Sequence, residues 1–378
     1  MSTVAGVIDS IRASYLQIPL ARPYRLSFGP VTHYDTILLQ MSAADGRSGF
    51  GEATLLTGYT DETIADSWNL TRELAHAFCG KSADEIAIRL DKLAPRAPFV
   101  CTAFHTALDM LRGHHLLSLA TITRVPILGL LQGEDESGLR DDFDRLCSEG
   151  YRTVKVKVGF DAHTDLIHLA LIQKVVAGRA LIRVDANQGY SAVDATAFIS
   201  GVDPAGIELF EQPCAAGDWA AHRCAVAAAA RTGLPLMLDE SIYGLRDIER
   251  AVNENACTYL KVKLMKFVSL DALVAAIERI HALGKRAVLG NGVACDVSCW
   301  MEACVAARYV DNAGEMNGFL KARRMLLAPP LRFEQGDIVL EPMVAPTVDP
   351  AAIASYKRDG VEHRQELHQC VCAPLSPA

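Results

Sequence analysis

The sequence predicts an α/β protein: a (β/α)8 barrel, preceded by an α+β capping domain that the C-terminal segment completes. From Val125 onward, short β-branched runs alternate with Ala-rich helical segments, as in βα units around a parallel sheet. Before that point the pattern is hairpin-like and helical, and after Pro329 it loses its period. The 378 residues exceed a typical single domain, so we expect a capping domain at 1–122, a barrel at 123–330 and a returning segment at 331–378.

Each part of this fold rests on a local pattern. Residues 34–53 alternate as a hairpin whose turn carries Asp45-Gly46, residues 62–80 have helical periodicity, and residues 331–342 are expected to form a short hairpin that returns to the capping domain. Helices are expected between the barrel strands at 162–176, 192–201, 219–232 and 269–284. The eight barrel strands are expected at 125–131, 151–158, 180–185, 206–211, 235–240, 258–264, 286–290 and 312–316.

Composition and charge restrict the class of protein. Half of the residues are hydrophobic, 22% are charged, and no apolar run reaches the roughly 18 residues of a membrane span. The first fifteen residues lack the basic flank and apolar core of a signal peptide, which favours a cytoplasmic protein. A net charge of -8 without basic clusters argues against nucleic-acid and membrane partners, and the 11 scattered cysteines lack zinc-site spacing. Small molecules are the expected partners.

Carboxylates follow three successive predicted strands. In a (β/α)8 barrel the catalytic groups lie at the C-terminal ends of the strands, where this chain places Asp185, Glu211 and Asp239. Three neighbouring carboxylates repel one another unless a cation neutralises them, and oxygen ligands suit Mg²⁺. The alternative is that each is a helix N-cap or a loop acid. Because all three close apolar strands in sequence, we expect a Mg²⁺ site.

Three of the lysines on the second and sixth predicted strands are candidates for the chemistry of the site. In the segment TVKVKVG (153–159), alternation places Lys155 and Lys157 on one face and the valines on the other. Alone, such a strand is more often half-exposed, but in a parallel barrel both lysines face the interior. Neighbouring cations are expected to lower a lysine pKa toward that of a general base. Lys263 lies across the barrel, so Lys157 and Lys263 face a bound substrate from opposite sides.

These motifs resemble the enolase superfamily, in the subgroup of muconate-lactonizing enzymes that also contains dipeptide epimerases, succinylbenzoate synthases and racemases. TVKVKVG is similar to the family's Lys-x-Lys strand, RVDANQGY, ELFEQP and MLDES to its three metal-ligand strands, and VKLMK to its sixth-strand lysine. The resemblance implies that Asp185, Glu211 and Asp239 bind Mg²⁺. It also implies that Lys157 and Lys263 are the acid/base pair of an α-proton abstraction through an enediolate, with Lys155 polarising the substrate carboxylate. Homo-oligomers are usual in this family.

The resemblance also places candidate substrate contacts. YRLSFGP (24–30) and ATLLTGYTDET (53–63) are similar to the family's two capping loops, although their aromatics are equally typical of hinge or core residues. Strand seven with its loop (288–296) and strand eight (313–319) carry polar residues that suit a substrate ammonium. The predicted substrate-binding residues are Tyr24, Phe28, Tyr59, Asn291, Asp296, Glu315 and Asn317.

Three functions remain open at this point. Strand eight has Glu315 and Asn317 where dipeptide epimerases carry an Asp-x-Asp pattern, and strand seven resembles the branch that handles proline-type amino acids. The leading hypothesis is therefore dehydration of cis-3-hydroxy-L-proline to pyrroline-2-carboxylate. The alternatives are a racemase or epimerase of proline betaine, an amino acid or a dipeptide, and a barrel that only binds a small molecule. Lys261 is expected either to pair with a carboxylate inside the barrel or to turn toward a helix, and Lys266 to be structural or solvated.

Overall fold

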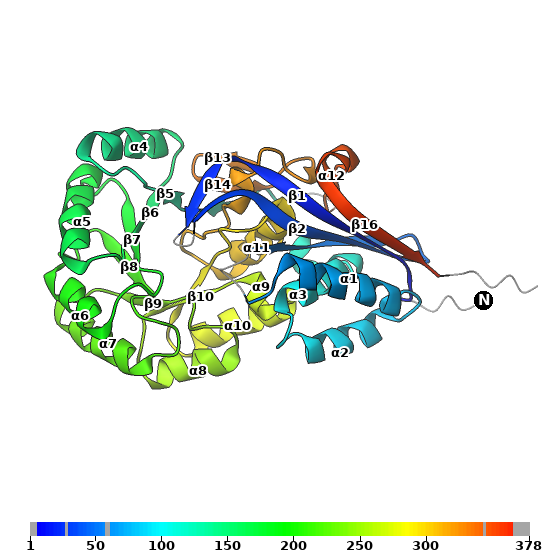
Figure 1. Cartoon of the computed structure of the whole chain (residues 1–378), viewed down its shortest axis with the longest axis horizontal. Helices are drawn as coiled ribbons and strands as arrows, with labels where there is room; N and C mark the ends of the chain where they lie inside the picture. Colours follow the sequence, from blue (N-terminus) through cyan, green and yellow to red (C-terminus); the bar gives the residue numbers. More distant parts are fainter. Residues whose placement is uncertain (1–5, 27–28, 57–60, 343–344, 366–378) are drawn as a thin grey trace, which may run out of the picture.

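The capping part is a four-stranded antiparallel sheet with two helices, α1 and α3, packed against it and a third, α2, packed against α3. A computed structural model describes residues 6–26, 29–56, 61–342 and 345–365. The sheet order is β16-β1-β2-β3, and α3 packs mainly against β3 (Figure 1). The predicted hairpin is confirmed, with Ser42 paired to Ser48 across a turn in which Gly46 has φ +87. The elements are β1 (Ile8–Leu26), β2 (Gly29–Ala43), β3 (Ser48–Leu55), β16 (Lys357–Arg364), α1 (Ile64–Phe78), α2 (Ala83–Leu93) and α3 (Pro98–Leu111).

The second part is a curled parallel sheet surrounded by helices, as the predicted fold class requires. Its seven strands run in the order β11-β10-β9-β8-β7-β6-β5, and helices cover the outer face (Figure 1). The strands are β5 (Gly129–Leu130), β6 (Thr153–Lys157), β7 (Leu181–Asp185), β8 (Ile207–Glu211), β9 (Leu236–Leu238), β10 (Tyr259–Val262) and β11 (Arg286–Leu289). The helices are α4 (Glu136–Ser148), α5 (Ala162–Val176), α6 (Ala192–Gly201), α7 (Trp219–Thr232), α8 (Leu245–Asn253), α9 (Leu264–Phe267), α10 (Leu270–Ala282) and α11 (Asp296–Tyr309).

The eighth strand position is occupied by single bridges. Glu315 pairs in parallel with Gly290 on one side, and Gly314 pairs with Ile127 on the other. These bridges join the two edges of the seven-stranded sheet. The predicted strand at 312–316 therefore takes its expected place but is too short to form a regular ladder.

The C-terminal segment differs from the prediction in one respect. The hairpin of β13 (Arg332–Glu334) and β14 (Asp337–Leu340) forms as expected, but it pairs with β4 (Thr123–Pro126). The return to the capping sheet is made by β16, which pairs with β1. β16 is mostly polar and solvent-facing, so it lacks the buried alternation that announces a strand in a sequence. The connecting elements are η1 (His115–Leu117), η2 (Gly318–Lys321), β12 (Leu327–Ala328), β15 (Thr347–Val348) and α12 (Pro350–Tyr356).

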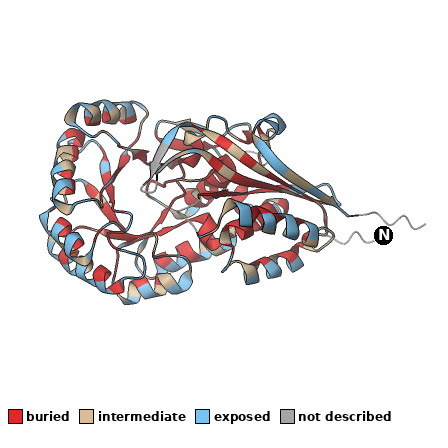
Figure 2. Ribbon diagram, in the orientation of Figure 1, coloured by how far each residue is buried: buried red, intermediate tan, exposed pale blue. Residues whose placement is uncertain are grey.

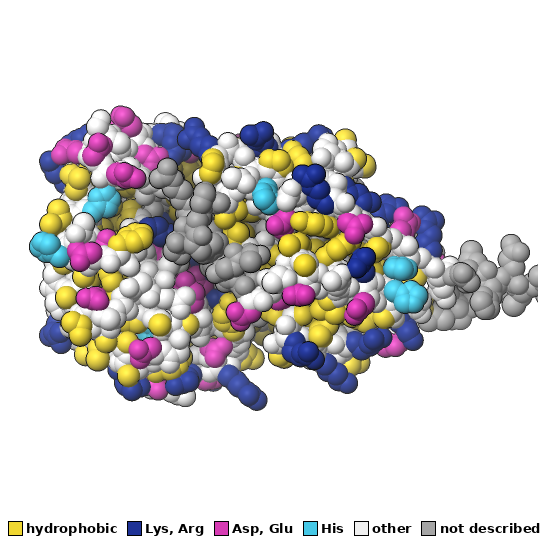
Figure 3. Space-filling view, in the orientation of Figure 1, with side chains coloured by type: hydrophobic (Ala, Val, Ile, Leu, Met, Phe, Trp, Pro, Cys, Tyr) yellow, Lys and Arg dark blue, Asp and Glu magenta, His cyan; other side chains and the backbone are white. Residues whose placement is uncertain are grey.

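Side-chain alternation on β6 agrees with the prediction. Val154 and Val156 are buried in the hydrophobic core that the outer helices share, whereas Lys155 contacts carboxylates inside the barrel. Buried residues line the strands and the inner faces of the helices, and exposed residues lie on the outside (Figure 2). On the visible face, Lys and Arg side chains alternate with Asp and Glu (Figure 3). No helix within the described ranges is long and apolar enough to span a bilayer.

A buried arginine near the start of the barrel strands is expected to be important for stability. Arg183 is 1% exposed and donates to Glu208 through Nε at 2.7 Å, and also to the Ala313 carbonyl and the Asn312 side chain. Removing one partner of such a pair leaves a buried charge unpaired, so Arg183→Met should lower the free energy of unfolding by about 3–5 kcal/mol. Urea denaturation measures the loss.

The control for this prediction is an exposed arginine with an ion pair of its own. Arg140 on α4 is 51% exposed and pairs with Glu136 one turn away. Arg140→Met should change the free energy of unfolding by less than about 0.5 kcal/mol. If both substitutions cost the same amount, burial of the Arg183 pair does not matter for stability.

The capping part and the barrel meet at a buried carboxylate. Glu52 on β3 is 1% exposed and accepts hydrogen bonds from the backbone N–H groups of Cys295, at 2.6 Å, and Ser298, at 3.1 Å. These amides lie at the start of α11, where a helix leaves its first N–H groups without partners. Glu52, on the capping sheet, thus accepts hydrogen bonds from the N–H groups at the start of a barrel helix.

The same carboxylate predicts a pH dependence of stability. Burial raises the pKa of Glu52 from 4.5 to about 7, against the effect of its two backbone hydrogen bonds. Below about pH 4.5 Glu52 is protonated in both the folded and the unfolded protein. Between about pH 4.5 and 7 Glu52 ionises in the unfolded protein but stays protonated in the folded one, which favours unfolding. The free energy of unfolding of the wild type, relative to Glu52→Gln, should therefore fall by about 3 kcal/mol across this window. Urea denaturation from pH 4.5 to 8 measures it, and a difference that stays constant with pH would contradict the assignment.

Candidate active site

Three carboxylates close three neighbouring strands of the barrel sheet. Asp185 is the last residue of β7, Glu211 is the last of β8, and Asp239 directly follows β9. The parallel register places Asp185 beside Glu211. The exposed fractions of the three residues are 0%, 1% and 2%. Buried charges of one sign at adjacent strand ends require cationic partners.

Two lysines stand at the two ends of this row. Lys157 ends β6, which neighbours β7, and Lys263 follows β10, which neighbours β9. Lys157 Nζ lies 2.6 Å from Asp185 Oδ2, and Lys263 Nζ lies 2.7 Å from Asp239 Oδ2. The Lys157 side chain is 39% exposed and that of Lys263 is 5% exposed. The structure thus encloses the row of carboxylates with one ammonium at each end.

Two further lysines lie between the carboxylates. Lys155 Nζ is 2.8 Å from Asp185 Oδ2, 2.9 Å from Glu211 Oε2 and 3.0 Å from Glu315 Oε2. Lys261 Nζ lies 2.8 Å from Glu211 Oε1 and also pairs with Glu315. Lys261 therefore points into the barrel and pairs with carboxylates, which is the first of the two placements that the sequence left open.

A glycine makes room for the Lys261–Glu315 pair. A Cβ added to Gly290 would lie 2.8 Å from both Lys261 Cε and Glu315 Cβ. No side chain fits there without moving this pair. The absence of a side chain at Gly290, directly after β11, thus allows the Lys261–Glu315 pair to form.

The ammonium groups control the pKa values of the carboxylates. Burial raises the pKa of Asp185, but Lys155 and Lys157 outweigh it and hold the pKa at about 2. The pKa of Asp239 is also held well below its ordinary value, because the neighbouring lysines outweigh burial. The surrounding carboxylates outweigh burial at Lys155 and raise its pKa well above the ordinary value. The lowering expected from neighbouring cations is thus not found at Lys155, because carboxylates surround it.

Lys266 and Glu240 extend the cluster on the Asp239 side. Lys266 Nζ donates to the carbonyl oxygen of Asp239 at 2.6 Å and to its Oδ1 at 2.9 Å, and it lies 4.4 Å from the centre of the Tyr243 ring. Lys266 is 7% exposed, so it is buried rather than solvated. Burial and the charge of Asp239 raise the pKa of Glu240 to about 7.

Asn187 is a site residue that sequence reasoning missed. It accepts a hydrogen bond from Lys157 Nζ and donates to Glu240 Oε1 at 3.1 Å, so it joins the two sides of the site. Its φ of +41 places it in the left-handed region, which Asn tolerates better than most residues. Its position two residues after Asp185 is the signal that could have found it, because that loop opens at the same strand end.

The donor set fits a hard divalent cation. Carboxylate oxygens are the ligands that Mg²⁺ prefers, and Asp185, Glu211 and Asp239 present them from adjacent strands. Within the described ranges, no three His, Cys, Asp or Glu side chains are grouped as a ready coordination shell, and lysine ammonium groups lie between the carboxylates. The repulsion between the three carboxylates therefore requires positive charge between them.

The predicted contacts on strands seven and eight are in different surroundings. Glu315 lies at the site beside Lys155. Asn291 is 5% exposed, and its backbone N–H donates to the Glu315 carbonyl at 3.2 Å. Asn317 accepts from Lys321 at 3.2 Å and donates to a backbone carbonyl at 3.2 Å. Only Glu315 among these three has its side chain against a lysine of the site.

Asp296 has its partners away from the lysines and the row of carboxylates. Both carboxylate oxygens of Asp296 accept backbone N–H groups, from Leu326 at 2.8 Å and Leu327 at 2.6 Å. We therefore assign Asp296 to holding that segment and leave it out of the proposed site. The backbone of Tyr24 lies on β1 and pairs with Val31. Phe28 and Tyr59 lie outside the described residues.

Comparison with known proteins identifies the family. The model of the family described as enolase C-terminal domain-like matches residues 138–345, more than half of the chain. The chain is a member of the enolase superfamily. This family assignment agrees with the strand-end lysines and carboxylates, and it confirms the resemblance that the sequence motifs predicted.

Several relatives of this enolase-superfamily member are epimerases and racemases. A hydrophobic dipeptide epimerase of Citrifermentans bemidjiense is 28% identical over 306 residues, which cover 75% of this chain and 81% of that protein. An N-succinyl-L-Arg/Lys racemase of Bacillus cereus is 23% identical over 316 residues, 79% of this chain and 82% of that protein. A crystal structure of a Cytophaga hutchinsonii dipeptide epimerase with Mg and D-Ala-L-Val superimposes with a TM-score of 0.84 at 18% identity, covering 94% of this chain and 99% of that one.

Proposed function

We propose that this protein is a Mg²⁺-dependent racemase or epimerase that inverts the α-carbon of an amino-acid-derived carboxylate. The observation that carries the proposal is the placement of Lys157 and Lys263 at the two ends of the carboxylate row, 2.6 and 2.7 Å from Asp185 and Asp239. Two bases on opposite sides of one carbon allow a proton to leave one face and return to the other. The similarity to epimerases and racemases supports the same chemistry.

Each residue of the site takes one role in this proposal. Asp185, Glu211 and Asp239 would hold the Mg²⁺, which when bound stabilises negative charge on the substrate carboxylate. Lys155, buried among carboxylates, neutralises and orients that carboxylate.

The two remaining lysines move the proton. Lys157 removes the α-proton of one enantiomer while Lys263, as an ammonium, delivers a proton to the opposite face. The roles exchange for the other enantiomer. The low exposure of Lys263 limits water at its side of the carbon, which strengthens its charge interactions.

Glu315 is the substrate contact that we retain on strand eight. It lies 3.0 Å from Lys155, so a substrate held by Lys155 is also next to Glu315. Because Lys261 already supplies Glu315 with an ammonium, Glu315 has less charge to offer to a substrate ammonium. We also retain Tyr24, Phe28 and Tyr59 of the capping loops as candidate contacts.

Dehydration of cis-3-hydroxy-L-proline would use the same two lysines, but the similarity to known proteins supports it less. The relatives named above invert carbon centres, and inversion uses both lysines without a leaving hydroxyl. We therefore place the epimerase hypothesis, an alternative from the sequence, ahead of the dehydratase hypothesis.

A substrate panel with Mg²⁺ distinguishes the two reactions. The purified protein is incubated with single enantiomers of dipeptides, N-succinyl amino acids, free amino acids, prolines and betaines, and with cis-3-hydroxy-L-proline. Chiral chromatography detects inversion, and mass spectrometry detects loss of water. Inversion of at least one compound supports the proposal. Loss of water from cis-3-hydroxy-L-proline without inversion of any compound would replace it with the dehydratase.

A further inference from the structure

The segment after Lys263 is a tight turn in a strained conformation. Lys263 is followed at once by the four-residue helix α9, whose C-cap residue, Val268, has φ +61. A β-branched residue in the left-handed region costs about 1–2 kcal/mol and persists only where its surroundings hold it. Contacts on several sides must therefore fix this turn.

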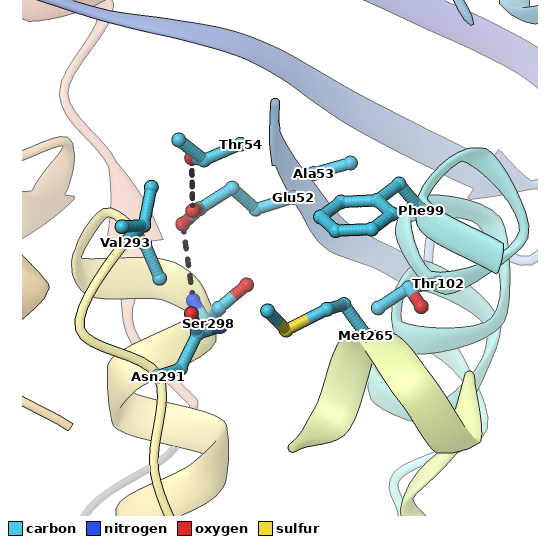
Figure 4. Close-up of a pocket in the computed structure, with 10 residues that line it drawn as sticks. Glu52, Ala53, Thr54, Phe99, Thr102, Met265, Asn291, Val293 and Ser298 are labelled. Atoms are coloured by element: carbon cyan, nitrogen blue, oxygen red, sulfur yellow. Dashed lines mark hydrogen bonds between the residues drawn. The ribbon is translucent and has the colours of Figure 1, made fainter. Parts of the chain in front are cut away.

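One set of contacts comes from the capping part. Met265 on α9 is 6% exposed and belongs to the hydrophobic core of the capping part, together with Phe99 on α3. Figure 4 shows Met265 and Phe99 extending into the same small pocket, which Glu52 also lines. At the far end of the turn, Asp109 Oδ2 on α3 accepts the Leu270 N–H at 3.0 Å.

A second contact comes from α11. Glu302 is fully buried, and its Oε1 accepts the backbone N–H of Leu264 at 3.1 Å. That amide is the one immediately after Lys263. The start of α11 is itself held by Glu52 of the capping sheet, through the bond to Ser298 drawn in Figure 4. A continuous set of contacts thus runs from the capping sheet through α11 to the backbone beside Lys263.

The loop after Lys157 is held differently. Asp165 on α5 accepts the N–H groups of Gly159 at 2.9 Å and Phe160 at 3.0 Å, so a barrel helix fixes this loop. The Lys157 side chain is also far more exposed than that of Lys263. The two proposed bases therefore depend on separate supports.

We propose that Glu302, together with Met265, positions Lys263, so that loss of either contact impairs the Lys263 half of the reaction and spares the Lys157 half. Neither residue contacts the reacting atoms in this account; both act through the backbone of the turn. The inference rests on the proposed two-base function. A displacement of about 1 Å at a catalytic group costs about 100-fold in rate.

The key variants are Glu302→Met, which keeps the size and removes the acceptor, and Glu302→Gln, which keeps the acceptor. Burial raises the pKa of Glu302 to about 8, so Gln also resembles the protonated carboxyl. Cys304→Ala, at another buried position of α11, controls for general damage to the helix. Met265→Ala loosens the same turn from the capping side, so it tests the inference even if Glu302→Met does not fold.

The readout is the exchange of the α-proton of each enantiomer in D₂O, followed by NMR. Lys263→Ala first identifies the enantiomer that still exchanges with retention, which is the substrate of Lys157. In Glu302→Met and Met265→Ala, exchange of that enantiomer should stay near the wild-type rate. Exchange of the opposite enantiomer, and all inversion, should fall about 100-fold. Glu302→Gln and Cys304→Ala should stay near wild type for both.

Hydrogen–deuterium exchange of the protein gives a second readout that needs no substrate. Glu302→Met should speed amide exchange in residues 263–269 and leave residues 157–161 unchanged. Equal loss of exchange for both enantiomers, or no loss for either, with unchanged amide exchange in 263–269, would overturn the inference while leaving the two-base function intact. If the wild type exchanges neither enantiomer of any substrate, the proposed function fails and the inference falls with it.

Discussion

Lys157→Ala and Lys263→Ala are each expected to lower inversion of the α-carbon by about 10²- to 10⁴-fold. Inversion requires a proton to leave one face and another to arrive on the opposite face, and the two lysines stand at opposite ends of the carboxylate row. Each variant should still exchange the α-proton of one enantiomer, because one base remains. Chiral chromatography of single enantiomers measures inversion.

The control for the lysine variants is a lysine outside the barrel. Lys174 on α5 is 63% exposed and pairs with Glu136 at the surface. Lys174→Ala should leave inversion at the wild-type rate. Retention of more than half of the wild-type inversion by either barrel variant would contradict the two-base assignment.

Glu211→Gln is expected to weaken Mg²⁺ binding by at least about 100-fold and to abolish turnover at ordinary Mg²⁺ concentrations. Glu211 lies on the middle strand of the three that carry the proposed ligands, so its loss removes an anionic donor from the centre of the row. Calorimetric titration with Mg²⁺, or Mn²⁺ titration followed by EPR, measures affinity without relying on activity.

Two controls accompany the Glu211 substitution. Glu278→Gln, on the exposed side of α10, should bind Mg²⁺ as the wild type does. Because Glu211 also pairs with Lys155 and Lys261, urea denaturation must show that the variant is folded. Unchanged Mg²⁺ affinity in a folded Glu211→Gln protein would remove Glu211 from the metal site.

Residues at strand ends were predictable from the sequence because two simple rules apply there. Alternation places Lys155 and Lys157 on one face of β6, and parallel strands bring Asp185, Glu211 and Asp239 to the same edge of the sheet. The helices that follow these strands also begin and end at or near the predicted residues. Local pattern therefore predicts this part of the fold and places the charged residues of the site together.

Buried acids that accept hydrogen bonds from distant backbone groups were not predictable in this way. Glu52 and Glu302 are buried acids whose partners are backbone amides distant in sequence, at Ser298 and Leu264. No periodicity signals such a contact. The neighbours of Lys261 were likewise undetermined, because pairing with Glu315 depends on how strand eight meets β11 at Gly290.

The most direct test of the central claim is α-proton exchange in D₂O by the wild-type protein with and without Mg²⁺. A single enantiomer of an amino-acid-derived substrate that the panel has identified is followed by proton NMR and chiral chromatography. Two-base chemistry predicts Mg²⁺-dependent loss of the α-proton signal together with formation of the opposite enantiomer carrying deuterium. Inversion that proceeds without incorporation of solvent deuterium, or at the same rate after chelation of Mg²⁺, would contradict it.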